Sequence, residues 1–292
     1  MNRSRTTLVA GIGIGLLVLA LIAGVVGIFS WASSRWSTPP SPPDPVCEAT
    51  IQSQSAQLDP EQSQNAAIIA GVAAQRQLVP RAVSIALTTA LQESGLRNLD
   101  YGDLDSLGLF QQRPSMGWGT PEQIMDPYYS TGKFFDVMVT VDDWQTADIG
   151  DVAQEVQRSG YPDAYEQHVD RARLLASALS GQTPAAWSCI VQGSPTPDPA
   201  QLTSAMTQAY GSAIKVLSTP ATSAQPASLT IAATGDEVAW SAAAFAVSWA
   251  SQTGVSAVTV GQFQWKASAS VLSGWVGVSD TSVDSETVLV TF

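Results

Sequence analysis

The chain has 292 residues, with 25 acidic side chains against 13 basic ones, two cysteines and one histidine. A net charge of −12 argues against a nucleic-acid-binding protein, because such proteins need basic patches to neutralise phosphates. One histidine and two cysteines also argue against a self-contained zinc site, so we expect no metal and no cofactor. The 45% apolar fraction predicts a folded core.

Residues 1–36 are predicted to hold the cytoplasmic N-terminus and a transmembrane helix. The uncharged stretch 8–29 is long enough, at about 1.5 Å per residue, to cross a hydrocarbon core of about 30 Å. Arg3 and Arg5 precede it, which favours a cytoplasmic N-terminus, and no clear cleavage site follows it. The sequence therefore predicts a single-pass protein of the cell membrane with most of the chain outside. The exported part has 10 basic and 25 acidic residues, a net charge of −15.

The segment that follows the predicted anchor is a stalk. Residues 37–45 are rich in proline and predict an extended spacer. Cys47 and Cys189 lie just inside the ends of the next segment, and in an oxidising compartment they predict a disulfide that closes a domain. Two unrelated buried thiols are the alternative.

Residues 46–190 predict a mainly α domain. Proline and capping residues mark the helix starts, and apolar residues recur at helical spacing behind them. No alternating strand pattern stands out. The predicted helices are 60–77, Pro80 to Gly95, a short helix from the capping box at Thr120 that leads into 128–139, and segments near 148–158 and 163–179.

Residues 191–227 predict a linker, and residues 228–292 a small α/β domain. Strands are expected at 228–232, 255–260 and 287–292, with an alanine-rich helix at 237–252. The last domain contains several tryptophans but no histidine, cysteine or converging carboxylates. We expect these tryptophans to be core or to form a face that binds the cell wall or an envelope protein.

The residues with recognisable chemistry lie between positions 92 and 118. Glu93-Ser94 is followed by Gly108-Leu109-Phe110-Gln111, and this ordered pair resembles the motifs of lytic transglycosylases and goose-type lysozymes. The surrounding residues 106–127 also resemble exported actinobacterial and phage-associated proteins of lysozyme-like type. The resemblance covers about 46–180 and implies a lysozyme-like fold that binds peptidoglycan glycan strands, with Glu93 as the catalytic residue.

Glycosidic cleavage needs a carboxylic acid at that place. The leaving oxygen must be protonated as the bond breaks, and burial keeps a carboxyl group protonated near neutral pH. Glu93 ends an apolar predicted helix, which suits that role. The candidate substrate-binding residues around it are two flat aromatic rings and three polar side chains: Tyr101 and Trp118, with Ser94, Gln111 and Gln112.

A second carboxylate decides between hydrolysis and transglycosylation. Asp103 and Asp105 are the candidates for it, or they belong to a solvated loop. We favour transglycosylation, because there the 6-hydroxyl of the sugar attacks and Glu93 alone suffices. The later tyrosine of many transglycosylases is replaced here by Val156, although Tyr161 or Tyr165 could act from another place.

Two functions follow from the sequence. The first is a membrane-anchored enzyme that cleaves the glycan strands of peptidoglycan. The second is a non-catalytic peptidoglycan-binding or scaffold protein of the cell envelope, which keeps the cleft without turnover.

Overall fold

The computed structural model describes residue 23 and residues 43–159, 162–280 and 282–292. Apart from Ala23, the predicted anchor lies outside the described residues, as does most of the predicted stalk. No helix among the described residues combines the length and the apolar character needed to cross a membrane. Residues 43–292 form one compact unit.

Proline-marked caps start most of the helices in the first half of this unit. Asp59 and Gln62 form a capping box at the start of α2, and Thr120 and Gln123 form another at the start of α4. These caps confirm the starts predicted from the sequence. The helices here are α2 (Pro60–Gln75), α3 (Pro80–Ser94), α4 (Pro121–Ile124), α5 (Pro127–Met138), α6 (Ile149–Gln157) and α7 (Glu166–Leu179), with 3₁₀ turns at Pro114–Met116 and Pro162–Ala164.

A small antiparallel sheet accompanies these helices. Its strand order is β2 (Gln54–Leu58), β1 (Cys47–Ile51) and β3 (Trp187–Cys189). Cys47 pairs with Cys189 in the register of β1 and β3, and the two form the predicted disulfide. The clasp thus joins the first and last elements of this half across 142 residues of sequence.

The second half is built on a six-stranded antiparallel sheet of order β4-β5-β9-β6-β7-β8. The helix that packs on it, α9 (Asp236–Ser248), buries an alanine-rich surface that includes Ala242 and Ala243. The other elements are α8 (Pro199–Tyr210), a 3₁₀ turn (Gly211–Ala213), α10 (Ala250–Thr253), β4 (Ile214–Thr219), β5 (Ser228–Ala233), β6 (Ala257–Val260), β7 (Phe263–Lys266), β8 (Val276–Gly277) and β9 (Thr287–Thr291).

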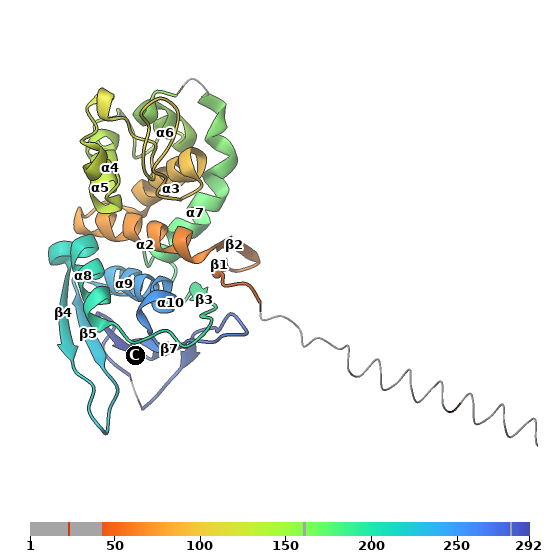
Figure 1. The fold of residues 1–292 in the computed structure, drawn as a ribbon, viewed down its shortest axis with the longest axis vertical. Coiled ribbons are helices and arrows are strands. Elements are labelled where there is room, and N and C mark those ends of the chain that lie inside the picture. Colours follow the sequence, from red (N-terminus) through yellow and green to blue (C-terminus); the bar gives the residue numbers. More distant parts are fainter. Residues whose placement is uncertain (1–22, 24–42, 160–161, 281) are drawn as a thin grey trace, which may run out of the picture. The chain divides into compact units, whose positions relative to one another are not determined.

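Helix α2 connects the two halves. It contacts α3, α5 and α7 on one side, and α8 and α9 on the other. Its buried residues include Ala66, Ala70 and Gly71, and a Cβ on Gly71 would lie 2.8 Å from the Cβ of Ala209. Small side chains therefore let α2 approach α8 closely, as Figure 1 shows from the position of α2 above α8 and α9.

The predicted fold class is wrong. A transmembrane helix, a mainly α lysozyme-like domain and a small C-terminal α/β domain were expected, whereas the described residues combine helices with two antiparallel sheets and contain no membrane-spanning helix. The strands of the small sheet were missed because they are short and polar, with Glu48 and Gln57 among them. Helix α8 and strand β4 were missed because prolines and threonines around them predicted a linker.

Candidate active site

Glu93 lies on the last turn of α3 and is half-buried. The helix ends there because Gly95 adopts a left-handed conformation with φ of 62°, in which its amide hydrogen-bonds back to Ala90 and Leu91. The preceding turns are buried, with Leu87 and Ala90 at zero exposure. The local sequence therefore places the Glu93 carboxylate at the end of a buried helix, where the side chain is still partly exposed to solvent.

The second motif is tied directly to the first. Ser94 donates its hydroxyl to the carbonyl of Leu109 at 2.7 Å and to that of Ala90 at 3.1 Å. The turn that carries Leu109 needs Gly108, whose φ is 74° and whose Cβ, if present, would lie 2.7 Å from the carbonyl oxygen of Ile124. Ser94, which was predicted to bind substrate, thus hydrogen-bonds the backbone of the protein and holds the turn beside Glu93.

Two side chains that lie more than 60 residues later in the chain, at the end of α6 and the start of α7, reach Glu93. The hydroxyl of Tyr165, at the start of α7, donates to Glu93 Oε1 at 2.5 Å. Gln157, at the end of α6, hydrogen-bonds Glu93 and donates to the carbonyl of Phe110 at 2.7 Å. Tyr165 is fully buried, so its hydroxyl is held in one place.

Burial dominates the ionisation of Glu93. Removal from water penalises the carboxylate and raises the pKa of Glu93 above its ordinary value, while the hydrogen bonds from Tyr165 and Gln157 partly offset the rise. Burial and the neighbouring Glu93 likewise raise the pKa of Tyr165, so this phenol is neutral and serves as a donor. A protonated carboxyl group with a fixed donor beside it can act as a general acid.

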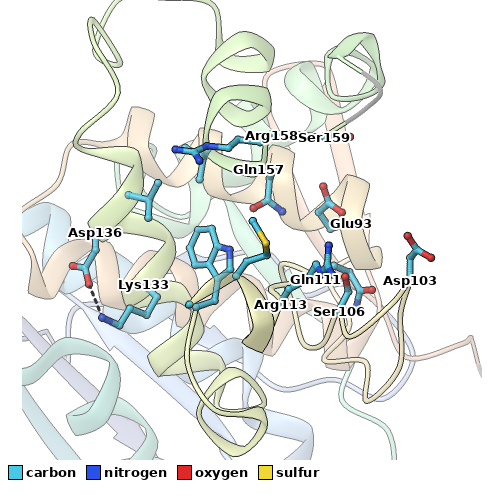
Figure 2. A pocket seen from close by; sticks show the side chains of 15 residues that line it. Glu93, Asp103, Ser106, Gln111, Arg113, Lys133, Asp136, Gln157, Arg158 and Ser159 are labelled. Atoms are coloured by element: carbon cyan, nitrogen blue, oxygen red, sulfur yellow. Dashed lines mark ion pairs between the residues drawn. The ribbon is translucent and has the colours of Figure 1, made fainter.

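Glu93 opens into a pocket of about 810 Å³. Figure 2 shows Glu93 and Asp103 on one side of it, and Lys133 and Asp136 on the other, with the latter two joined by an ion pair. The loop after the second motif, α5 and the end of α6 provide most of the walls. The lining residues are Glu93, Asp103, Ser106, Gln111, Arg113, Met116, Gly117, Trp118, Lys133, Asp136, Val137, Val156, Gln157, Arg158 and Ser159.

The predicted binding residues divide into two groups. Gln111 and Trp118 line the pocket together with Glu93. Tyr101 does not line it and is 68% exposed, while Gln112 is buried and donates to the carbonyl of Ser130 at 3.1 Å. Of the two adjacent glutamines, therefore, Gln111 faces the ligand space and Gln112 ties the loop to α5.

The two candidate second carboxylates also differ. Asp103 lines the pocket. Asp105 instead pairs with Arg113 at 2.6 Å and accepts from the amide and hydroxyl of Ser115, and these bonds hold the pKa of Asp105 well below its ordinary range. Asp105 is thus engaged in fixing the loop.

Sequence reasoning missed part of the pocket. Lys133 and Asp136 were hidden because they lie one helical turn apart on α5, a spacing typical of a solvated helix face. Arg158 was hidden because a basic residue at a helix end is common. No group of three or more acidic, histidine or cysteine side chains that could hold a metal ion occurs in the part of the chain that the structure describes.

The aromatic residues of the second half are mostly core. Trp265 is fully buried, whereas Trp240 and Trp275 are half-buried and pack edge to face at 5.0 Å. Their predicted role in binding the wall or an envelope partner stays a prediction.

Comparison with known proteins adds no assignment: no protein-family model matches the chain, and no curated protein is significantly similar to it in sequence.

Proposed function

We propose that this chain is an exported enzyme that cleaves the glycan strands of peptidoglycan, with Glu93 as general acid and base. The observation that carries the proposal is the half-buried Glu93, whose pKa is raised by burial and which opens into a large pocket beside Tyr165. The Cys47–Cys189 disulfide supports an extracytoplasmic location, because disulfides persist in oxidising compartments.

The chemistry that we propose needs one carboxyl group. Protonated Glu93 gives its proton to the glycosidic oxygen as the bond from C1 to that oxygen breaks. The 6-hydroxyl of the sugar that contains this C1 then forms a bond to C1, and the proton of that hydroxyl returns to the Glu93 carboxylate. The products are a strand with a free 4-hydroxyl and a strand that ends in a 1,6-anhydro sugar, and no water is consumed.

The surroundings of Glu93 support this cycle. The hydroxyl of Tyr165 donates to Oε1 and Gln157 also hydrogen-bonds the carboxyl group, so two side chains hold Glu93 in place at the pocket wall. Because Tyr165 stabilises the carboxylate, it also helps Glu93 to release its proton, while burial favours the return of a proton later. The two opposing influences suit a group that must act as both acid and base.

A second carboxylate on the pocket wall makes hydrolysis the second candidate. Asp103 lines the same pocket as Glu93, and hydrolysis uses a carboxylate pair to activate water or to form a covalent intermediate. Asp105 does not suit that role, because it is bonded to Arg113 and Ser115. The two mechanisms differ in whether Asp103 is needed.

Purified cell wall is the substrate for the test. We expect wild type to release soluble muropeptides and Glu93→Gln to lose at least about 10³-fold of that rate, since general acid catalysis contributes roughly 10²- to 10⁴-fold and the same group acts twice. Asp103→Asn is the matched control, as it also neutralises a pocket carboxylate. Undiminished release by Glu93→Gln contradicts the proposal, and loss with Asp103→Asn as well selects hydrolysis. Glycan binding by wild type without any cleavage selects a non-catalytic binding module.

A further inference from the structure

The pocket has as many basic as acidic residues, although the molecule as a whole is strongly acidic. The exported part of the chain has ten basic residues against 25 acidic ones. Three of those ten, Arg113, Lys133 and Arg158, line the pocket that contains Glu93.

Two of these three cations are already paired. Arg113 contacts Asp105 at 2.6 Å, and Lys133 contacts Asp136 at 3.7 Å. Among the described residues, no acidic side chain lies within ion-pair distance of Arg158. Arg158 therefore offers an unpaired guanidinium to whatever occupies the pocket.

The position of Arg158 is coupled to the candidate catalytic centre. Arg158 ends α6 in a left-handed conformation with φ of 53°, and its amide donates to the carbonyl of Gln154 at 2.7 Å. The residue before it, Gln157, hydrogen-bonds both Glu93 and the carbonyl of Phe110. Figure 2 shows the Arg158 guanidinium on the side of the pocket away from Glu93. An anionic group of the ligand bound at Arg158 would therefore lie at some distance from the bond that is cleaved.

The chemistry of a guanidinium selects the ligand group. Its planar fork forms two parallel hydrogen bonds to a carboxylate, which a neutral acetamido or hydroxyl group cannot match. A peptidoglycan strand carries carboxylates on its muramic sugars. They are free lactyl groups where the peptide is absent, and they lie on the stem peptide where it is present.

We propose that Arg158 binds a carboxylate of the muramic sugar or its peptide, so that the pocket selects carboxylate-bearing strands over neutral chitin-like ones. This inference rests on the proposed function. Lys133, whose partner Asp136 is shared with Arg76, adds a second positive charge to the same pocket.

The experiment measures binding rather than turnover. The full-length chain with Glu93→Gln is titrated calorimetrically with three saccharides of equal length: chitotetraose, the alternating tetrasaccharide with free lactyl carboxylates, and the same tetrasaccharide with stem peptides. We expect Arg158→Gln to weaken at least one carboxylate-bearing ligand about 10-fold and to leave chitotetraose within about 2-fold. The ligand that loses affinity identifies which carboxylate is bound.

Two further variants make the result specific. Lys266→Gln removes an equal charge from an exposed side chain at the end of strand β7, outside the pocket, and should change no affinity. Arg158→Lys keeps the charge but not the fork and should restore only part of the affinity. Arg158 is exposed, so unfolding midpoints should be unchanged.

The outcomes separate the two proposals. If all three saccharides bind and Arg158→Gln weakens none of them, or weakens chitotetraose equally, this inference is wrong and the proposed function stands. If none of the three binds, the proposed function is wrong, and this inference with it.

Discussion

Tyr165 donates a hydrogen bond to Glu93 Oε1 although 72 residues separate them in the chain. The contact joins the N-cap residue of α7 to the last turn of α3, and these two helices pack against each other. It places a buried neutral phenol against a carboxyl group whose pKa burial has already raised. The ionisation of Glu93 is therefore set by tertiary packing.

Tyr165→Phe should move the alkaline limb of the pH–rate profile to higher pH. The phenol stabilises the carboxylate and so lowers the pKa of Glu93, and removing it leaves burial unopposed by that bond. The pH dependence of kcat/KM on soluble glycan strands checks this. Tyr210→Phe is the control, because Tyr210 is equally buried and loses a hydrogen bond to Ser241 of 2.8 Å far from the pocket. A limb that moves to lower pH, or that moves equally in the control, contradicts the assignment.

The stability of wild type should fall as pH rises above the ordinary range of a glutamate pKa. Because the pKa of Glu93 is raised in the folded state, the folded chain binds this proton more tightly than the unfolded chain does. Binding of this proton stabilises the fold fully at a pH below the pKa of Glu93 in the unfolded chain. The stabilisation is lost as pH rises through the pKa of Glu93 in the folded chain. Urea unfolding of wild type and Glu93→Gln across this range measures the difference.

Glu93→Gln should show a flatter dependence on pH over the same window, because it has no proton to lose there. Parallel curves for the two proteins would mean that burial does not shift the pKa of Glu93.

Ser94→Ala should lower both stability and turnover. The loss of its bond to the Leu109 carbonyl should cost about 1 kcal/mol of unfolding free energy, with kcat falling more than KM rises. Ser180→Ala is a matched control, since Ser180 donates only to the carbonyl four residues before it, as Ser94 also does to Ala90. Chemical denaturation and steady-state kinetics report the two effects. Equal kinetics for both variants would show that the bond to Leu109 does not matter for the site.

Gly108→Ala should destabilise more than Gly95→Ala. Both glycines have positive φ, so both substitutions strain the backbone by about 1 to 2 kcal/mol. A Cβ at Gly108 would also lie 2.7 Å from the Ile124 carbonyl, whereas nothing lies within 4 Å of a Cβ at Gly95. The unfolding free energy of Gly95→Ala measures backbone strain alone, whereas that of Gly108→Ala measures strain together with the steric clash at Ile124. Equal values would mean that the turn at Gly108 relaxes freely.

Much of the candidate site is predictable from local sequence. Proline caps and apolar periodicity gave α2 and α3 nearly to the residue, and so placed Glu93 at a helix end. The motif at Gly108 predicted a turn close to Glu93, and the bond from Ser94 to the Leu109 carbonyl holds the turn there. The disulfide was predicted from the expected oxidising compartment and from the two cysteines at the ends of one segment. Each of these features depends on chemistry within a few residues or on a pair of unique side chains.

The rest depends on long-range contacts. No local signal distinguishes Tyr165, which reaches Glu93, from Tyr101, which is exposed. Nor does any local signal tell that Gln111 faces the pocket and Gln112 the interior, because Gln111 ends a turn in a left-handed backbone conformation, with φ of 47°, that a non-glycine residue rarely adopts. The short polar strands of the small sheet likewise need a long-range contact, because β1 pairs with β3, which lies more than 130 residues later in the chain.

Mass spectra of the products released from purified cell wall decide whether Glu93 catalyses transglycosylation. We expect wild type to yield muropeptides ending in 1,6-anhydro sugars, lighter by one water than hydrolysis products, and Glu93→Gln to yield essentially none. Anhydro products released equally fast by Glu93→Gln would contradict the role of Glu93.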